Sequence, residues 1–578
     1  MRVLATLALL GLLSAGAVAQ PTTETLSGVI TGTVTLDANE VYLLDGEVYV
    51  DNGATLNIPA GTVIKGKREP SQGNGEASVL VVQRGGTLNA IGSASAPVIF
   101  TSELDDVNDP FDLGETARGL WGGVIILGNA TTNRGERSIE GLSPDNPRVL
   151  YGPGAGFPVD DDDDSGTLSY VSIRHAGYTR NPNEEINGLT LGAVGRGTTL
   201  EYIEVFANSD DSFEFFGGTV NGKYLAGVFG GDDDFDMDIG YSGNLQFLFS
   251  IKNESGDVGR CIEADGASSP FTATPLTNFT ISNLTCIGSG LGSNPGGSDA
   301  GGPALKLREN LQGFIANSIF VDWQTSAGGI DLEIQPEEDD GNPIGDATIS
   351  TAQNFREGEM VIENNLFYDF SVGNTPADIV RRDLPEIESE VADENLFVSA
   401  QLVGIGRDQS RSLDPRPGSG SPAAGAADFT YDRLGDFFRP VSFIGAFAPV
   451  GTDDEGSVDD DDAVWLEGDW TALYTAFYLS NFSTPTVGGP AEVAFDLTVG
   501  PNPTRGDATV RFSLDRAQRV RLAVYDALGR EVAVAAEGHL AAGPAEATVP
   551  TADLPTGVYV VRLQGESGAV TRQLSVVR

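Results

Sequence analysis

The segment SDDSFEFFGG (Ser209–Gly218) returns as GDDDFDMDIG (Gly231–Gly240), with the aligned residue numbers raised by 22. The alignment places Glu214 on Asp236, and apolar residues alternate with acidic ones in both copies. Because alternate residues of a strand share a face, each copy predicts a short strand with one apolar and one acidic face. The chain therefore repeats one strand, together with its charge, at a fixed interval.

Two other pairs of segments repeat at a shift of 32, which equals one 22-residue turn plus a ten-residue loop. They are GATL and GGTL (Gly53–Leu56 and Gly85–Leu88), and LSYVSIRHAG and LEYIEVFANS (Leu168–Gly177 and Leu200–Ser209). No convincing amphipathic helix precedes about Pro385, and strand-rich units of this kind stack because none buries its apolar face alone. The pattern predicts an all-β chain whose body is a right-handed parallel β-helix built from 22-residue turns. A multi-sheet β-sandwich is the alternative, although it accounts less naturally for the close duplication.

The C-terminal segment contains three ordered motifs, PNP (501–503), VYDALGREV (524–532) and LPTGVYVVRL (554–563). Alternating runs separated by Gly, Pro or Asp predict the short strands of a small immunoglobulin-like β-sandwich over residues 494–578. The order of the motifs resembles the type A C-terminal sorting domain of type IX secretion cargo. The resemblance implies that residues 494–578 are read by the type IX secretion machinery, so that the protein reaches the surface or surroundings of a Gram-negative bacterium. An ordinary immunoglobulin-like module is the alternative.

The first residues have the features of a cleaved export signal. Arg2 is followed by the apolar run Leu4–Leu13 and by an A-x-A site at Ala17–Ala19. We expect a signal peptide over residues 1–19, with cleavage near Ala19–Gln20. No later stretch reaches 18 uninterrupted apolar residues, so no membrane span is expected in the mature chain.

The order of domains expected after the signal is a β-helix with an N-terminal cap (20–440), a C-terminal cap segment (441–483), a linker (484–493) and the sorting domain (494–578). Asn283, Asn364 and Asn365 are expected at corners of the turns, because asparagine tolerates left-handed backbone geometry. GLWGGVIILGNA (Gly119–Ala130), the repeated DD–F pattern and FIGAF (Phe443–Phe447) resemble a group of secreted bacterial β-helix proteins without an agreed activity. That resemblance covers roughly residues 40–480 and implies the fold only.

The chain is strongly acidic, with a formal net charge of −49 at pH 7. Residues 494–578 carry nine Arg and nine Asp or Glu, whereas residues 20–493 carry 24 basic and 74 acidic side chains, a net charge of −50. Such a surface repels nucleic acid and anionic lipid and attracts cations, so no nucleic-acid partner is expected. Adaptation to a saline habitat is an alternative explanation of the charge. The acidic runs Asp160–Asp164 and Asp459–Asp462 are expected to be solvated loops.

The two cysteines, Cys261 and Cys286, are separated by little more than one turn of the repeat, and an oxidising destination permits a disulfide between them. The local patterns place Cys261 on the strand that repeats Phe235, and Cys286 on the strand that follows the one ending at Ile251. This alignment favours two separate core thiols over a bridge.

The repeated acidic strands are the best candidate for a metal site. Outward residues one turn apart lie about 4.8 Å from each other, so Glu214 above Asp236 requires solvent, a raised pKa or a bound cation. Oxygen-only clusters favour hard ions, and Ca²⁺ is the expected extracellular choice. The candidate ligands are Asp210, Asp211, Glu214, Asp232, Asp233, Asp234, Asp236 and Asp238. A cation-screened acidic face without a fixed ion is the alternative.

The same carboxylates are candidates for acid and base catalysis, with Glu214, Asp236 and Asp238 as the catalytic residues. Asp236 and Asp238 would lie about 6.7 Å apart along one strand, within the range of about 6.5–9.5 Å found in inverting glycosidases. The Gly-His-Gly and Arg-x-Lys segments expected of β-helix polygalacturonases are missing, and no P-loop, nucleophile elbow or zinc spacing is present. A pectate-lyase-like site would need Lys or Arg near the Ca²⁺, for which Lys223 and Arg260 are the candidates.

The only histidines are His175, expected at a corner or in the core, and His539 in the sorting tail. Tyr170, Tyr202, Phe216 and Tyr241 would stack on sugars if they stood along the outside of the coil, although packing beneath loops is the stronger expectation. We therefore expect an exported glycan-binding, adhesive or structural module, with an extracellular polysaccharide as its partner and without a catalytic role. The alternative is a polysaccharide lyase or an inverting glycoside hydrolase that uses the stacked carboxylates.

Overall fold

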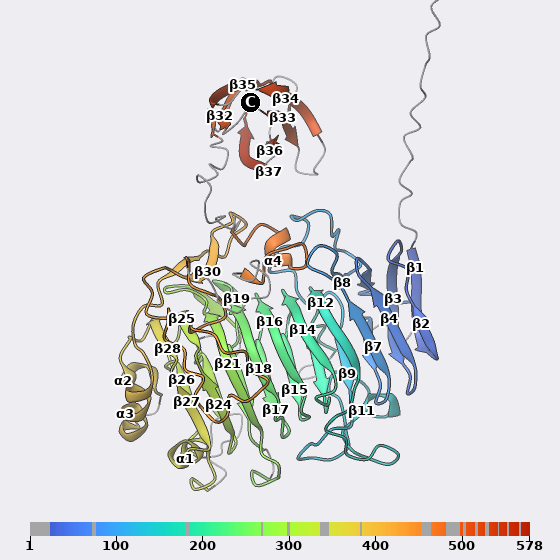
Figure 1. Cartoon of the computed structure of the whole chain (residues 1–578). Helices are drawn as coiled ribbons and strands as arrows, with labels where there is room; N and C mark the ends of the chain where they lie inside the picture. Colours follow the sequence, from blue (N-terminus) through green and yellow to red (C-terminus); the bar gives the residue numbers. More distant parts are fainter. Residues whose placement is uncertain are drawn as a thin grey trace, which may run out of the picture. The chain divides into compact units, whose positions relative to one another are not determined.

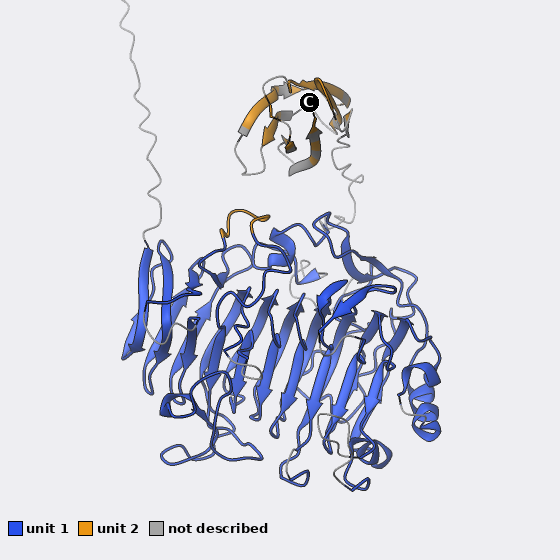
Figure 2. Cartoon of the chain, turned by 180° about the vertical axis from the view of Figure 1, so that it is seen from behind, with its two compact units in different colours: residues 1–105, 113–482 blue, residues 106–112, 483–578 orange. Residues whose placement is uncertain are grey.

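The structure is a computed structural model that describes residues 23–577 with internal gaps. The residues outside the description are 1–22, 72–76, 181–184, 268–269, 298–300, 336–345, 382–383, 452–463, 481–497, 501–503, 515–517, 526–530, 541–542, 552–553, 556, 566–567 and 578. The predicted signal peptide, the predicted linker 484–493 and the acidic run Asp459–Asp462 therefore lie outside the described residues. The chain divides into one unit of residues 1–105 and 113–482 and a second unit of residues 106–112 and 483–578 (Figure 2).

The first unit is a parallel β-helix, in which 24 strands form one continuous sheet that winds around an apolar interior (Figure 1). The strand pairings define three faces. The first face holds β2 (Thr33–Thr35), β4 (Thr55–Pro59), β7 (Thr87–Ile91), β24 (Gln312–Ala316) and β27 (Met360–Glu363). The second holds β5 (Val63–Gly66), β8 (Val98–Ser102), β25 (Ile319–Trp323) and β28 (Leu366–Phe370). The third holds β6 (Val79–Val82), β9 (Val124–Leu127), β13 (Leu189–Gly192), β15 (Phe213–Phe216), β17 (Phe235–Asp238), β20 (Ile262–Asp265), β23 (Leu305–Arg308) and β26 (Ile330–Leu332).

Longer strands bend from one face into the next. Those shared by the first and second faces are β12 (Gly166–Arg174), β14 (Thr199–Phe206), β16 (Asn221–Val228), β18 (Asn244–Ile251) and β21 (Asn278–Ile287). Those shared by the second and third faces are β1 (Thr23–Ile30) and β3 (Val41–Val50). Small two-stranded pairs lie in the loops: β10 (Arg137–Ser138) with β11 (Leu150–Tyr151), β19 (Ser255–Asp257) with β22 (Asn294–Gly296), and β29 (Leu402–Ile405) with β30 (Leu413–Pro417).

The register confirms the repeats predicted from the sequence. Glu214 pairs with Asp236 across β15 and β17, at the shift predicted for a single turn. Leu168 pairs with Leu200 across β12 and β14, and Thr55 pairs with Thr87 across β4 and β7, both at the longer shift predicted for a turn with an inserted loop. The repeat therefore reflects stacking of successive turns.

One corner of the coil is built from residues in the left-handed backbone region. They are Tyr170, Tyr202, Tyr224, Phe247, Asn283, Asn317 and Asn364, with φ between 52° and 60°. Asn283 and Asn364 thus occupy the corner predicted for them, but bulky aromatic residues rarely adopt this geometry. Here the rings stack along the coil, with the Tyr202 and Tyr224 centroids 4.3 Å apart, and Trp470 packs edge-on against Tyr202. Stacking of the rings favours the strained corner.

The segment predicted as a C-terminal cap lies along the side of the coil and not over its end. Ala472 and Leu473, at the start of helix α4 (Ala472–Thr475), donate their backbone N–H groups to the carboxylate of Glu204 on β14, at 2.6 and 3.0 Å. The Trp465 and Trp470 side chains join the apolar cluster over the second face. Tyr170 and Tyr202 pack against this segment, while Phe216 and Tyr241 are buried, so the expectation of packed aromatics is confirmed.

The end of the coil opposite β1 is covered by a helix. Helix α3 (Pro385–Glu394) supplies Ile387 and Val391 to the interior core (Figure 1). Helix α2 (Pro376–Ile379) precedes it, and helix α1 (Thr351–Glu357), which the sequence did not predict, packs against β27.

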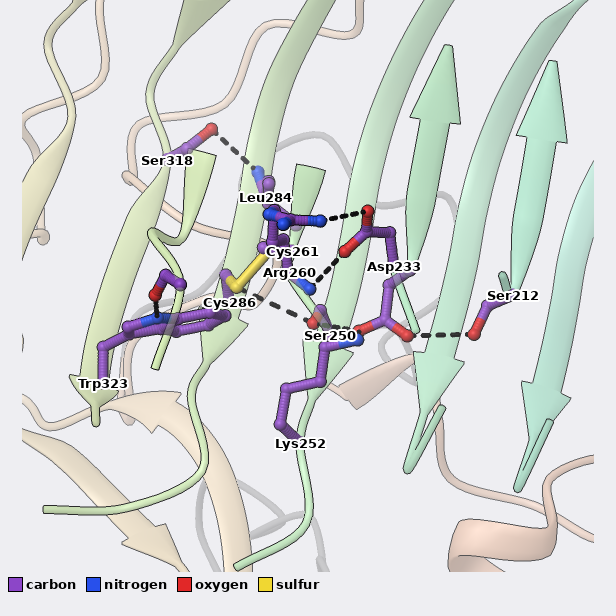
Figure 3. Close-up of a disulfide and its surroundings, with 12 residues drawn as sticks. Ser212, Asp233, Ser250, Lys252, Arg260, Cys261, Leu284, Cys286, Ser318 and Trp323 are labelled. Atoms are coloured by element: carbon purple, nitrogen blue, oxygen red, sulfur yellow. Dashed lines mark hydrogen bonds and ion pairs between the residues drawn. A yellow bond between two sulfur atoms is a disulfide. The ribbon is translucent and has the colours of Figure 1, made fainter. Parts of the chain in front are cut away.

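Cys261 and Cys286 form a disulfide inside the coil, so the prediction of two separate thiols is wrong (Figure 3). Cys286 lies on β21 as predicted, opposite Ser250, whereas Cys261 directly precedes β20, whose first residue Ile262 pairs with Phe235. The two cysteines lie on different walls of the coil, but both side chains are fully buried and their Cα atoms are 6.3 Å apart. Opposing walls meet in the narrow interior, which the alignment of strands does not reveal.

The second unit contains two antiparallel sheets. One holds β31 (Thr498–Gly500), β32 (Ala508–Leu514) and β35 (Gly543–Val549), and the other holds β34 (Glu531–Leu540), β33 (Gln518–Tyr525), β36 (Gly557–Gly565) and β37 (Gly568–Val576). Apolar residues of both sheets form one core. The immunoglobulin-like topology stays a prediction. Within the described residues, no helix is long and apolar enough to cross a membrane.

Candidate metal centre

The acidic residues of the duplicated strands lie on the outside of the third face. Phe213 and Phe235 fill the interior, so the alternate positions Glu214 and Asp236 point outward. On the preceding strand, β13, Thr190 is the register partner of Glu214. Three successive turns thus present the oxygens of Thr190, Glu214 and Asp236 in one row.

Carboxylates from the adjoining corner join this row. One oxygen each of Asp211, Glu214 and Asp236 lie within 4.8 Å of one another, and the same holds for Asp210, Asp211 and Asp232. Asp211 and Glu214 are buried, with only 8% and 6% of their surfaces exposed. We call Asp210, Asp211, Glu214, Asp232, Asp236 and Asp238, together with Glu140, the acidic cluster.

Two residues of the cluster's surroundings were not predicted from the sequence. Glu140 lies in the long connection between β9 and β12, and Asn187 lies in the connection between β12 and β13. The Asn187 side-chain amide donates to the carboxylates of both Glu140, at 3.1 Å, and Glu214. Neither connection belongs to the 22-residue repeat, so the periodic pattern gave no signal for them.

The cluster disfavours its own ionisation. Burial raises the pKa of Glu214, and the carboxylates of Glu140, Asp211 and Asp236 raise it further. Burial also raises the pKa of Asp236, and the negative charge of the neighbouring Glu263 raises it further. The pKa values of Asp210, Asp211 and Asp238 are raised by burial and by like charges in the same way. Such a group of carboxyls is stable at neutral pH only if it keeps protons or binds a cation.

Two of the predicted ligands point elsewhere. Asp233 pairs with the Arg260 guanidinium at 3.2 Å and accepts the Arg260 backbone N–H (Figure 3). Asp234 pairs with Lys252 at 3.0 Å, and both side chains are fully buried. These two carboxylates are therefore paired with cations of the chain, and we do not count them in the acidic cluster.

The next turn of the same face is balanced in charge. Glu263, the register partner of Asp236, pairs with Arg260, Lys306 and Arg308. Burial alone would raise the pKa of Glu263, but these three cations outweigh it and lower the pKa to about 2. Among the described residues, no Lys or Arg forms a salt bridge with Glu214 or Asp236. The contrast distinguishes Glu214 and Asp236 from Glu263, the next outward carboxylate in the same row.

One buried oxygen beside the cluster and one within it have no hydrogen-bond partner among the described residues. The Thr190 hydroxyl, on a side chain that is 1% exposed, has no partner among the described residues, and neither does Oδ1 of Asp238. A buried polar atom without a partner is costly unless a ligand or water completes it. Thr190 is the register partner of Glu214 on the side opposite Asp236, so its hydroxyl lies one strand away from the carboxylates that approach one another.

The remaining candidates from the sequence fall outside this site. Lys223 lies on β16 and packs over the ring of Phe437, 4.6 Å from its centroid, whereas Arg260 lies beside the cluster. His175 occupies a corner with φ of 59° and is 3% exposed, as predicted, and its Nδ1 lies 2.6 Å from the carbonyl oxygen of Ala117.

Known proteins resemble this chain in two regions. Residues 498–577 match the secretion system C-terminal sorting domain, which assigns the tail to the type IX machinery and the protein to the cell surface or the exterior. No curated protein matches the chain. The crystal structure of dimeric latent PorU from Porphyromonas gingivalis is 23% identical over 15% of this chain and 10% of that chain, with a TM-score of 0.14, so the chain spans about a tenth of it. Residues 28–381, more than half of the chain, match the pectate-lyase like beta helix domain, and the protein belongs to that family.

Proposed function

We propose that this protein is a glycan-binding and structural module of the cell surface or its surroundings, and that its coil holds a Ca²⁺ ion at the acidic cluster. The observation that supports the ion is the approach of Asp211, Glu214 and Asp236 to within 4.8 Å of one another, while none of the three forms a salt bridge with a Lys or Arg among the described residues. Ca²⁺ takes about six to eight oxygen ligands. The second carboxylate group, which Asp210 and Asp232 form with Asp211, supplies further oxygens.

The burial of Glu214 supports a binding role over a catalytic one. A general acid or base must come within hydrogen-bond reach of the substrate. Glu214 is 6% exposed, and the amide of Asn187 joins it to Glu140. A cation bound by Glu214 at this position would stabilise the stacked turns, and the carboxylate would then have no catalytic role.

The alternative function is a polysaccharide lyase or an inverting glycoside hydrolase that uses Glu214, Asp236 and Asp238. One observation favours it: Arg260 stands beside the acidic cluster, where lyase chemistry at a bound Ca²⁺ would use a cation. Arg260 is, however, already engaged with Asp233 and Glu263.

The two functions are separated by incubating the mature protein with a panel of polysaccharides and measuring new reducing ends and unsaturated products. Binding without products is the expected result. Turnover that is lost in Asp236→Ala and retained in Glu201→Ala, an exposed glutamate on β14, would establish the enzyme instead. The cleavage of residues 1–19 near Ala19–Gln20 belongs to the same proposal and is tested by sequencing the N-terminus of the exported protein.

A further inference from the structure

A polar cavity of about 520 Å³ lies where the coil meets the segment that runs along its side. Its walls come from three distant parts of the chain: the β8–β9 connection (Glu115), the β18–β19 connection (Asn253, Glu254) and the β29–β30 loop (Asp408). Tyr478 of the side segment closes it. The cavity shares no residue with the acidic cluster, and its volume lies within the range of about 300–1,000 Å³ typical of small-molecule sites.

The walls are held in place before any ligand enters. The Tyr478 hydroxyl donates to the Glu115 carboxylate at 2.5 Å. The β29–β30 loop is tied to the side segment, because the Arg411 backbone N–H donates to the Phe477 carbonyl oxygen at 2.8 Å. Asp408 accepts from the Ser412 hydroxyl at 3.0 Å. A preformed site loses little ordering entropy when it binds.

One buried side chain in the wall of the cavity, Asn253, has a hydrogen-bond donor without a partner among the described residues. Asn253 is 5% exposed, and its side-chain Nδ2 has no hydrogen-bond partner among the described residues. An unpaired buried amide is costly, and Asn253 is among the residues that line the cavity. This observation points to a ligand independently of the carboxylates.

The negative charges that line the cavity determine whether its ligand is charged or neutral. The carboxylates of Glu115, Glu254 and Asp408 line it. Arg407, a cation in its wall, is already bound to Asp322 at 2.7 Å and to the Lys252 carbonyl oxygen at 2.9 Å. The cavity therefore repels uronates, sulfates and phosphates, while its carboxylates accept hydrogen bonds from hydroxyl groups.

We propose that this cavity is a binding site for a neutral sugar unit, whose hydroxyls donate to Glu115 and Asp408 and whose ring or carbonyl oxygen accepts from Asn253. The inference rests on the proposed glycan-binding role and assigns that role a site and a ligand class. It excludes polyuronates as the ligand of this cavity.

The test uses the full mature chain, a panel of neutral hexose and N-acetylhexosamine oligosaccharides, and a matched panel of uronate oligomers, with affinities measured by calorimetry. We expect binding of a neutral oligosaccharide that weakens at least tenfold in Glu115→Gln and in Asn253→Ala. Glu115→Gln keeps the acceptor for Tyr478, and Asn253→Ala removes an amide without a partner among the described residues, so both variants should keep the wild-type melting temperature. Glu390→Gln, an exposed position on α3, is the control and should bind as the wild type does.

The possible failures are distinct. Neutral-sugar binding that persists in both variants would overturn the cavity assignment and leave the glycan-binding role intact. Binding of uronates alone would overturn the ligand class. If no member of either panel binds, the cavity assignment and the proposed glycan-binding role both fail, while the Ca²⁺ site keeps its own test.

Discussion

Glu214 and Asp236 are register partners on the neighbouring parallel strands β15 and β17, and both point away from the coil interior. Each approaches Asp211 and the other to within 4.8 Å. Like charges directly opposite each other destabilise a sheet. The duplication of an acidic strand is thus unfavourable by itself, and a cation bound between the turns would make it favourable.

Removing the buried disulfide should destabilise the coil. Replacing Cys261 and Cys286 together by alanine opens a loop of 25 residues, and a disulfide closing such a loop contributes about 2–4 kcal/mol. We expect the free energy of unfolding to fall by this amount in denaturant titrations under oxidising conditions. A reductant should lower the wild-type value and leave the variant unchanged. Equal stability of the two proteins would contradict the bridge.

Glu204 should hold the side segment onto the coil. Its fully buried carboxylate accepts the backbone N–H groups of Ala472 and Leu473 and the hydroxyl of Ser172. Glu204→Ala leaves these donors unpaired, which costs about 1–3 kcal/mol. We expect faster hydrogen exchange and easier proteolysis within residues 464–479, with Glu201→Ala as the exposed control. Unchanged protection of the segment would show that its apolar contacts alone hold it.

The register of the coil was predictable because the signal is local. Phe213 and Phe235 alternate with acidic residues in two copies, so the sequence itself carries the strand, its inward face and the shift between turns. Corners were predictable where asparagine occupies them, as at Asn283, but not where tyrosine does, as at Tyr202, because ring stacking between turns supplies the stabilisation.

The site was only partly predictable, because its other contacts are not periodic. Asp233 and Asp234 lie next to the candidate ligands in the sequence, yet they form salt bridges with Arg260 and Lys252. The sequence separation of such pairs depends on the length of the loops between them, so no fixed period predicts it. Glu140 reaches the cluster from a connection without repeats. The disulfide joins opposing walls, a relationship that strand alignment does not contain.

Asp163 should make stability depend on pH. It was expected in a solvated loop but is 8% exposed, and burial raises its pKa from 3.8 to about 6. Between these values the folded chain holds a proton that the unfolded chain has released, so the contribution of Asp163 to stability falls as pH rises from about 4 to about 6. Asp163→Asn does not titrate. Its free energy of unfolding relative to the wild type should therefore rise by about 1–3 kcal/mol across this window and stay level above pH 7.

That prediction is checked by denaturant titrations of both proteins at pH 4 and pH 7.5. Asp162→Asn, an exposed neighbour, is the control and should show no such difference. A constant difference between Asp163→Asn and the wild type at both pH values would mean that the pKa of Asp163 is not raised.

Deletion of residues 494–578 should stop export at the outer membrane. These residues include the matched sorting domain, so the truncated protein should accumulate in the periplasm of a type IX-competent host. Fractionation and surface proteolysis measure the distribution. Arrival of the truncated coil at the surface would show that another segment carries the sorting signal.

Isothermal calorimetry of Ca²⁺ into the chelator-treated mature protein tests whether the acidic cluster binds a Ca²⁺ ion. We expect one saturable site per chain, and a rise in stability of about 2.7 kcal/mol when free Ca²⁺ exceeds the dissociation constant a hundredfold. Glu214→Gln should weaken this site at least tenfold, whereas Glu201→Gln on the exposed surface of β14 should bind as the wild type does. Absence of heat and of any change in melting temperature, or equal binding by Glu214→Gln, would contradict the account.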